Sequence, residues 1–262
     1  MRGVARLKPM HDAELESHEL SQYADGIRRV ARPCLVGNPS ETQSNSYFGG
    51  MPRVTPDFDW PTKDGYPLAF VGQLHCRDIE LVPSNDGDLL FFYDNRHWGD
   101  SPKDLGHAIV AHVPSGIERH EPDLPIQTVP AFFGLTTKTV SPKHYQRVDV
   151  QFSSSKSYPP YERKLLAFFD DVGKECYAEF CDYIRPDIQI GGFPLPIQSD
   201  FMEQDCVNAF GLGEVDDWIL LLQLFEIGDM KWGDAGGLYW FIHQDDLQAM
   251  RYDSVWMVSQ CH

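Results

Sequence analysis

Cysteine is scarce in this chain of 262 residues, and its six cysteines are scattered. None of them forms a CxxC pair, and the closest two, Cys176 and Cys181, are separated by four residues. Small secreted scaffolds and structural zinc sites need denser and more regular spacing. The pattern therefore argues against a fold held together by disulfides and predicts a reduced protein of the cytoplasm.

Long hydrophobic runs are also lacking. No segment approaches the roughly 20 consecutive apolar residues that a membrane-spanning helix needs. The first residues, MRGVARLKPMHDAELE, contain no apolar stretch of the length found in signal peptides. We therefore expect neither a transmembrane helix nor a secretory leader.

Basic residues are few compared with acidic ones. The chain has 22 lysines and arginines against 39 aspartates and glutamates, which gives a net charge of −17. Such a protein repels the phosphates of nucleic acids and the surfaces of anionic membranes, so we expect neither as a partner. A partner selected by charge would be a basic protein, although the acidity also serves solubility alone.

Signatures of catalysis are missing as well. The chain contains no GxSxG, no P-loop, no GxGxxG that opens a helix and no HExxH. Its ten histidines are dispersed, so we predict no catalytic residue, no cofactor and no metal. Two alternatives stay open: a zinc site assembled in space from groups such as His107 and His112, and an acid/base set around His243.

What the sequence does contain is one pattern used twice. Residues 217–247 carry an apolar run with Gln-Leu, a polar connector, a glycine and an aromatic run, and residues 67–95 repeat this order more weakly. A Gly-Gly-x-Pro motif precedes each copy, at residues 49–52 and 191–194. Three landmarks in one order indicate an internal duplication.

Short apolar and aromatic runs bounded by turn residues are typical of buried strands. We therefore predict an α+β fold, with a strand-rich, internally duplicated antiparallel or mixed sheet as the core and with peripheral helices. The predicted organisation is a tail and helix over residues 1–31 and one domain over residues 32–262, with pseudo-repeats at about 49–152 and 191–258 joined by a helical segment at 161–185.

Several landmarks together resemble a known family. They are Gly49-Gly50-x-Pro52, Trp60-Pro61, Gln73-Leu74, the GDLLFF run at 87–92, Gly191-Gly192-x-Pro194 with Gln198, Gln223-Leu224 and the WGDAG run at 232–236. In this order they resemble the YwqG-like family, a bacterial domain of unknown function (DUF1963). The resemblance implies a duplicated α+β fold and no established reaction, and some relatives suggest a toxin–immunity role. Residues 104–158 carry no part of it.

Gln73 and Gln223 interrupt apolar runs at corresponding positions. A buried amide needs hydrogen-bond partners, because leaving it without them costs about 1–3 kcal/mol. The structural interpretation is that each amide ties its strand to the Gly-Gly-x-Pro loop. The functional interpretation is that both amides line a shared groove. Similarly, Trp232 and Asp234 form either a packed turn or the wall of a ligand pocket.

These observations lead to two functional hypotheses. The first is a cytosolic, non-enzymatic binding protein that engages a basic protein partner in a role of the toxin–immunity type. The second is an enzyme or small-ligand protein with a cleft between the repeats. The candidate ligand-binding residues are Trp60, Gln73, Gln198, Gln223, Trp232 and Asp234. The oligomeric state stays open, including assembly with a second copy of the chain.

Overall fold

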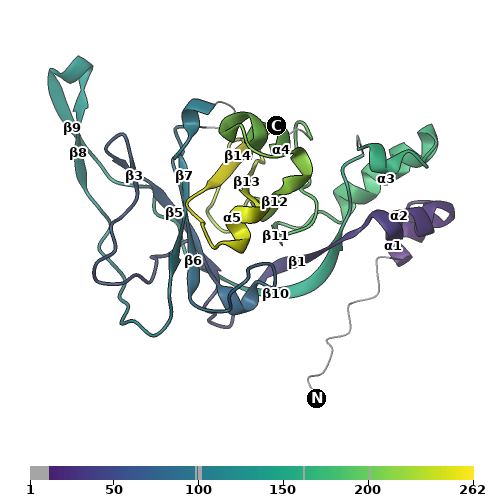
Figure 1. The fold of residues 1–262 in the computed structure, drawn as a ribbon, viewed down its shortest axis with the longest axis horizontal. Helices are drawn as coiled ribbons and strands as arrows, with labels where there is room; N and C mark the ends of the chain where they lie inside the picture. The colour runs from purple at the N-terminus through teal and green to yellow at the C-terminus, as the bar shows by residue number, and fades with distance from the viewer. Residues whose placement is uncertain (1–11, 98, 100–101, 162, 201) are drawn as a thin grey trace.

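A computed structural model describes residues 12–97, 99, 102–161, 163–200 and 202–262. The tail predicted for residues 1–11 lies outside these ranges. The described chain forms one ten-stranded sheet, two small two-stranded sheets and several helices (Figure 1). All strand pairings within these ranges are antiparallel. The α+β prediction is confirmed.

The strands of the large sheet follow a spatial order that differs from the chain order. In space the order is β14 (Val255–Gln260), β13 (Gly237–His243), β12 (Trp218–Leu224), β11 (Ile188–Ile190), β1 (Arg32–Pro39), β10 (Val148–Ser157), β2 (Tyr47–Phe48), β5 (Ala69–His75), β6 (Asp88–Tyr93) and β7 (Ala108–Val113). The small sheets are β3 (Thr62–Lys63) with β4 (Tyr66–Pro67), and β8 (Gln127–Ala131) with β9 (Thr136–Val140).

The helical elements are short. The α-helices are α1 (Asp12–Ser17), α2 (Ala24–Val30), α3 (Asp171–Tyr183), α4 (Met202–Phe210) and α5 (Gln244–Gln248). The 3-10 turns are η1 (Ser21–Tyr23), η2 (Cys76–Asp78), η3 (Pro102–Asp104), η4 (Phe132–Gly134), η5 (Lys164–Leu166) and η6 (Val215–Asp217). Within the described ranges, no helix combines the length and apolar character needed to cross a bilayer.

The large sheet has two halves of the same design. One half contains β2, β5, β6 and β7, and the other contains β11, β12, β13 and β14 in the corresponding order. The strand that precedes each set in the chain pairs with the opposite half: β1 lies beside β11, and β10 lies beside β2. Since β1 and β10 also pair with each other, the repeats interlock through exchanged strands. In space each half is thus flanked by a strand, β1 or β10, that precedes the other half in the chain.

The sheet folds over so that its halves share a core. Phe91 packs edge-on against Trp240 with ring centroids 5.6 Å apart, and Tyr93 packs against Trp232 at 5.5 Å. The outward faces carry separate apolar clusters, one on each half. Consequently β5, β6, β12 and β13 are buried on both faces, which explains their nearly continuous apolar sequences.

Helices and a free hairpin occupy opposite ends of the molecule (Figure 1). At one end, α1, α2 and α3 form a small apolar cluster. The side chain of Asp170 caps α3 by accepting a hydrogen bond from the Gly173 N–H at 2.7 Å, within the predicted helical segment. At the other end, β8 and β9 project away from the sheet as a hairpin. The hairpin belongs to the segment 104–158, in which the sequence pattern offers no landmark of the resemblance.

Candidate functional site

The Gly-Gly-x-Pro motifs make the same turn in both halves. Gly49 and Gly50 have φ of 65° and 67°, and Gly191 and Gly192 have φ of 71° and 72°. These values lie in the left-handed region, which glycine enters without the steric penalty that other residues incur. Two successive glycines are therefore required wherever the chain leaves β2 or β11.

The predicted partnership between the glutamines and these turns is confirmed. Gln73 Oε1 accepts a hydrogen bond from the Arg53 N–H at 3.0 Å, and Gln223 Oε1 accepts one from the Leu195 N–H at 2.8 Å. In each half the donor is the residue that follows the proline of the motif. The structural interpretation of both amides therefore holds.

The two glutamines do not meet in a shared groove. Gln73 faces Leu90 across the sheet and lies with the outer cluster of the first half. Gln223 faces Tyr239, which belongs to the outer cluster of the second half. Both amides are almost fully buried, and the common core of the halves lies between them. Packed side chains therefore occupy the position of the cleft that the small-ligand hypothesis requires between the repeats.

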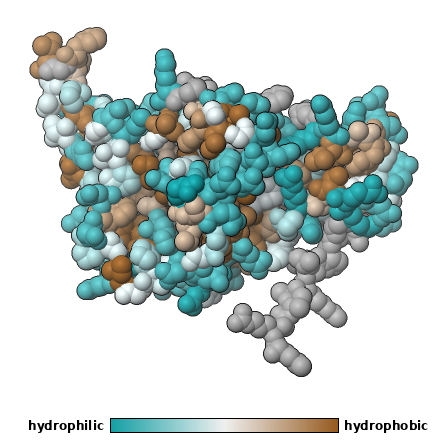
Figure 2. All heavy atoms as spheres, in the orientation of Figure 1, coloured by the Kyte–Doolittle hydropathy of each residue, from teal (hydrophilic) through white to brown (hydrophobic). Residues whose placement is uncertain are grey.

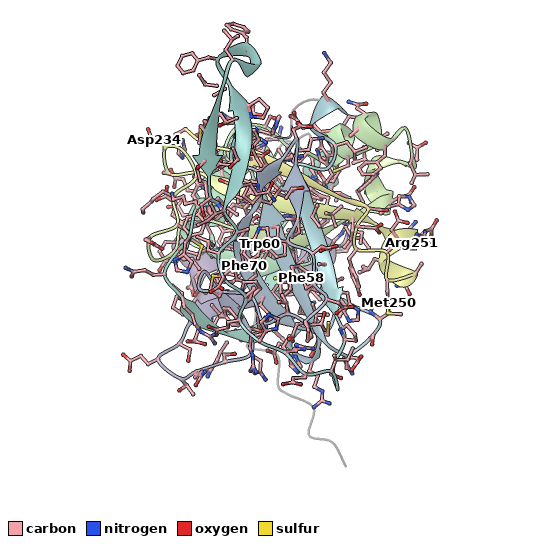
Figure 3. The ribbon with its side chains drawn as sticks, turned by 90° about the vertical axis from the view of Figure 1, so that its left-hand side faces the viewer. Phe58, Trp60, Phe70, Asp234, Met250 and Arg251 are labelled. Carbon is pink, nitrogen blue, oxygen red and sulfur yellow. The ribbon has the colours of Figure 1, made fainter. Side chains whose placement is uncertain are left out.

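The remaining predicted residues lie apart from one another. Trp60 Nε1 donates to Leu68 O at 2.8 Å, on the outer face of the first half, whereas Asp234 is exposed at a distant turn (Figure 3). Trp232 is buried in the common core, which supports the packed-turn interpretation. Gln198 is exposed beside the second half. The six candidates do not converge on one cavity, and their role in ligand binding stays a prediction.

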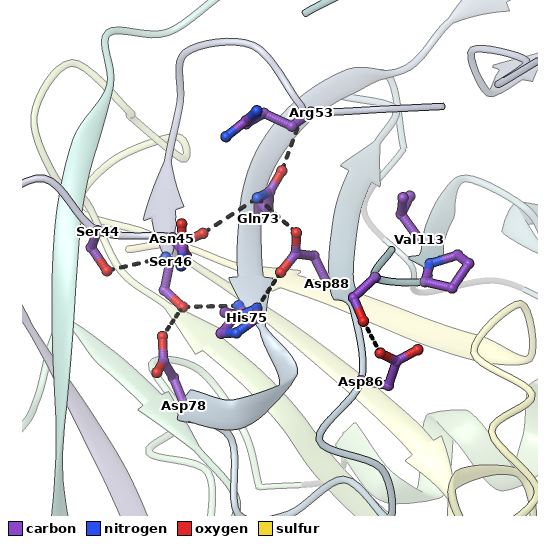
Figure 4. Close-up of polar contacts among 12 residues, drawn as sticks. Ser44, Asn45, Ser46, Arg53, Gln73, His75, Asp78, Asp86, Asp88 and Val113 are labelled. Carbon is purple, nitrogen blue, oxygen red and sulfur yellow. Dashed lines mark hydrogen bonds and ion pairs between the residues drawn. The ribbon is translucent and has the colours of Figure 1, made fainter. Parts of the chain in front are cut away.

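A network that includes charged side chains surrounds Gln73. Gln73 Nε2 donates to Asp88 Oδ2 at 3.1 Å, and His75 Nδ1 lies 2.6 Å from Asp88 Oδ1 (Figure 4). The Arg119 guanidinium forms an ion pair with the same carboxylate, which is almost fully buried. Because Arg119 neutralises Asp88 and the amide adds a hydrogen bond, the buried charge is compensated.

The duplication shows which of these residues the fold itself requires. Gln73 pairs with Leu90 in the first half, and Gln223 pairs with Tyr239 in the second. In the first half, His75 lies two residues after the glutamine, and Asp88 lies two residues before its partner. The equivalent positions of the second half are Phe225 and Gly237. The glutamines and glycines are common to both halves, so they are structural. The His75–Asp88 network belongs to the first half alone.

A concave site opens beside this network. It has a volume of about 420 Å³, and its lining residues are polar or charged: Gln43, Ser44, Asn45, Tyr47, Arg53, Gln73, Arg119, His120, Glu121 and Arg147. A neighbouring hollow of about 230 Å³ shares Arg53, Gln73 and Arg119 with it and reaches His75 and Asp88. We call these two hollows together the arginine pocket.

Two of the three arginines are held in fixed positions. Arg147 pairs with Asp149 at 2.7 Å, and its guanidinium lies 3.6 Å from the ring centroid of Tyr47. Hydrogen bonds from Arg147 hold the pKa of Asp149 below its ordinary value, so this carboxylate stays charged. Arg119, besides its ion pair with Asp88, donates to the carbonyl oxygens of Val113 at 2.9 Å and Pro114 at 2.6 Å.

The pocket contains hydrogen-bond donors that the chain does not use. Within the described residues, the Arg53 guanidinium has no hydrogen bond or ion pair, and its side chain is exposed. The Nη1 group of Arg147 and the Nε group of Arg119 likewise have no acceptor among the described residues. Since a guanidinium carries five N–H donors and no acceptor, the pocket presents donors to whatever enters it.

At the corresponding place the second half has a smaller hollow of about 130 Å³, which Leu195 and Gln198 help to line. Leu195 takes the position of Arg53, and it is buried. Arg147 directly precedes Val148, the residue of β10 that pairs with β2. In the second half β1 takes the place of β10, and its residue equivalent to Arg147 is Cys34, which is buried. Both arginines are thus replaced by small or apolar side chains.

Of the six predicted site residues Gln73 lines this pocket, but sequence reasoning missed its three arginines. Arg53 directly follows a recognised motif, and aligning the two repeats at Gly-Gly-x-Pro contrasts it with Leu195. That contrast was the available signal. Arg119 and Arg147 lie in a segment without recognised landmarks, and only the folded chain brings them to Arg53.

Metal-binding geometry is not part of this site. Over the residues whose structure is described, no group of three or more His, Cys, Asp or Glu side chains is arranged to hold a metal ion. All six cysteines have free thiols, and four of them are buried.

Comparison with known proteins gives one match. The sequence model of a family described as "Domain of unknown function (DUF1963)" matches residues 46–261. These residues include both halves of the large sheet, the three arginines of the pocket and the hairpin, and they exclude β1, the first two helices and the pocket residues 43–45. No curated protein matches the chain.

Proposed function

This chain belongs to the DUF1963 family, and we propose that it is a binding protein for a small anionic ligand held in the arginine pocket. One observation carries the proposal: three arginines converge on one concave site in a protein whose net charge is −17. A surface chosen only for solubility gives no reason for three of the few basic residues to gather in a hollow.

The chemistry of the pocket favours oxyanions. The planar fork of a guanidinium matches the two oxygens of a carboxylate or a phosphate, and such charge-assisted hydrogen bonds are stronger than neutral ones. Asp149 and Asp88 fix the guanidinium groups of Arg147 and Arg119 before any ligand arrives. A ligand therefore loses little affinity to the ordering of these side chains.

The lining also indicates a ligand with more than one polar group. Asn45 and Gln43 bring amides, and Glu121 brings a carboxylate to the same rim. A volume of about 420 Å³ lies within the range typical of sites for small molecules, rather than of sites for a single ion. Phosphorylated or polycarboxylated metabolites combine the required charge and size.

Isothermal titration calorimetry with phosphate, citrate and a sugar phosphate tests the proposal. We expect saturable binding of at least one, and Arg53→Ala should weaken it about tenfold to a hundredfold, since one charged hydrogen-bond donor contributes about 1.5–3 kcal/mol. Arg29→Ala, which removes an exposed arginine from α2 at the helical end of the molecule, is the matched control. Equal affinities of the Arg53→Ala protein and the unmodified protein would contradict the proposal.

Two sequence-based expectations continue as proposals. A basic protein partner, in a toxin–immunity role or another, rests on the net charge alone. Its test is capture from host lysate at low and high salt, because charge-based association weakens with ionic strength. A cytoplasmic location is supported by the six free thiols, which reducing compartments preserve.

A further inference from the structure

The β8–β9 hairpin is the most isolated element of the described chain (Figure 1). Its strands pair from Gln127 and Val140 at the base to Ala131 and Thr136 at the tip. Five residues of extended strand reach roughly 17 Å, at about 3.4 Å per residue. Val129, midway along β8, is buried and β8 contacts β4, so the part of the hairpin that stands free is the outer three residues or so of each strand, roughly 10 Å.

The tip is apolar and open to solvent. Phe132, Phe133 and Leu135 have relative exposures of 78%, 106% and 85%. Figure 2 shows hydrophobic side chains gathered at the free end of this hairpin. Single exposed apolar residues are common, but three within four positions at the end of a projection form a patch that marks an interaction site.

The backbone at the tip is strained. Phe132 and Phe133 have φ of 46° and 56°, in the left-handed region that bulky residues rarely adopt. This conformation gives neither ring burial within the chain, since both are among the most exposed apolar side chains. Strain of this kind persists where it serves function, and the burial that compensates for it must come from another surface.

The charge of the hairpin is opposite to that of the molecule. From Leu124 to Arg147 the sequence contains no aspartate or glutamate, whereas it contains Lys138, Lys143 and Arg147. The rest of the chain holds all 39 acidic residues. Of these three residues, Lys138 lies in the hairpin itself. A hairpin with one lysine, no acidic residue and an apolar end is complementary to a surface that is anionic outside and apolar beneath.

We propose that the tip of this hairpin inserts into the surface of an anionic phospholipid bilayer. Phe132, Phe133 and Leu135 enter the boundary between headgroups and acyl chains, where aromatic side chains are favoured, and Lys138 lies at the headgroups. A convex tip needs no matching pocket in a bilayer, because lipids adapt to its shape. A protein partner would need a cavity that fits both rings.

The distance between tip and body reconciles this contact with the acidity of the protein. Charges separated by more than the Debye length, about 8 Å at physiological salt, are largely screened from each other. The free part of the hairpin beyond the buried Val129 spans roughly 10 Å, which exceeds this length, so the acidic body is not strongly repelled. The expectation that the net charge excludes anionic membranes thus applies to the body and not to the hairpin. A single hairpin of this kind gives weak, reversible attachment to a membrane.

Co-sedimentation with vesicles tests the inference. The full chain should sediment with vesicles of phosphatidylcholine and phosphatidylglycerol, and more weakly with phosphatidylcholine alone. The double variant Phe132→Ser, Phe133→Ser should lose at least about tenfold in partitioning, because each ring contributes its burial. Val172→Ser removes an exposed apolar side chain from α3 and is the matched control.

Two further readouts separate insertion from loss of folding. Because the tip residues are exposed, the double variant should keep the melting temperature of the unmodified protein. In a Phe133→Trp variant, the emission in excess of that from the six native tryptophans, obtained by subtracting the spectrum of the unmodified protein, should shift to the blue only when anionic vesicles are added. The inference is overturned if the folded protein sediments with neither vesicle, or if the double variant and the unmodified protein sediment equally.

Discussion

Gln73 and Gln223 perform the same task in the two halves, but their surroundings differ. Each accepts a backbone hydrogen bond from the loop after its Gly-Gly-x-Pro motif. Gln73 also accepts from the Tyr47 hydroxyl at 3.1 Å and donates to Asp88. The shared bond belongs to the fold, and the additional bonds connect Gln73 to the arginine pocket.

Replacing each glutamine with leucine measures this difference. Gln223→Leu leaves the buried Leu195 N–H without its acceptor, which should lower the free energy of unfolding by about 1–3 kcal/mol. Gln73→Leu removes partners from the Arg53 N–H, Tyr47 and Asp88, so its cost should be larger, about 3 kcal/mol or more. Urea denaturation of both variants provides the comparison. Equal costs would show that the additional bonds of Gln73 contribute nothing.

The Arg147–Asp149 pair gives a prediction about pH. Hydrogen bonds from Arg147 depress the pKa of Asp149 in the folded protein. The pair therefore stabilises the fold above the unfolded pKa of about 3.9, and this stabilisation is lost as the pH falls through the folded value.

Removing the arginine tests the cause of this shift. In Arg147→Met the pKa of Asp149 should rise toward its ordinary value, which an NMR titration of the carboxyl carbon measures. The acid limb of stability against pH should become shallower in the same variant. An unchanged pKa would show that Arg147 is not the cause.

At the residue scale the sequence predicts what is repeated and misses what is unique. The glutamines and the glycine turns could be predicted because each appears twice in the same order. The meeting of Arg53, Arg119 and Arg147 could not, because different segments of the chain build it and only Arg53 lies beside a motif. The partnership of His75 with Asp88 depends on strand register, which a single sequence specifies only weakly.

Among the elements, the two Gly-Gly-x-Pro turns have similar backbone φ angles, but different atoms lie near their glycines. A Cβ added at Gly191 has its nearest neighbours at 3.9 Å, on Leu81 and Pro33. A Cβ added at Gly49, the equivalent residue, overlaps the carbonyl oxygen of Gln146. Both positions have positive φ, so alanine is strained at each.

This pair of sites separates backbone strain from steric overlap. Gly191→Ala should cost about 1–2 kcal/mol, the penalty for a left-handed residue with a Cβ. Gly49→Ala adds overlap with backbone that cannot move aside and should cost about 3 kcal/mol or more. Thermal denaturation of both variants checks the order. A Gly49→Ala protein as stable as Gly191→Ala would contradict the geometry of the first turn.

The exchange of β1 and β10 shows where prediction of elements from sequence ends. The order of the motifs indicates a duplication, and β5 with β6 and β12 with β13 follow from their apolar runs. The first strand of each repeat pairs instead with the other repeat, through contacts between residues more than a hundred positions apart. Local patterns carry no information on such pairings, so the sequence does not predict this exchange of strands.

At the scale of the molecule, closure of the folded sheet depends on contacts between its far edges. His107 Nε2 lies 2.9 Å from Met257 O, and Trp256 Nε1 donates to Gly99 O at 3.2 Å. His107 Nδ1 also lies 2.5 Å from Asp104 O. His107 is buried, and this burial lowers its pKa, although the two carbonyl contacts act in the other direction.

The closure should therefore weaken in mild acid. The unfolded chain binds a proton at His107 more readily than the folded one, so stability from this residue is complete above the unfolded pKa of about 6.5 and declines as the pH falls toward the lower folded value. His107→Gln should flatten the dependence of unfolding free energy on pH in this window. A slope that is equal in the variant and the unmodified protein would exclude His107 as its source.

Comparison of equivalent positions in the two interlocked halves shows which half carries the arginine pocket. One half of the duplicated sheet keeps buried or apolar residues at the positions where the other has Arg53 and Arg147. A duplicated fold can retain stability in one copy while the other acquires charges. The arginine pocket is thus a property of the first half, supported by a strand, β10, that the second repeat contributes.

The most direct test of the arginine pocket is a crystal of the protein soaked with selenate and examined at the selenium absorption edge. Our account predicts an anomalous peak within hydrogen-bonding distance of the Arg53 guanidinium, near Arg119 Nε and Arg147 Nη1, and no such peak there in crystals of Arg53→Ala. Selenate bound elsewhere on the molecule, with this pocket empty at saturating concentration, would contradict it.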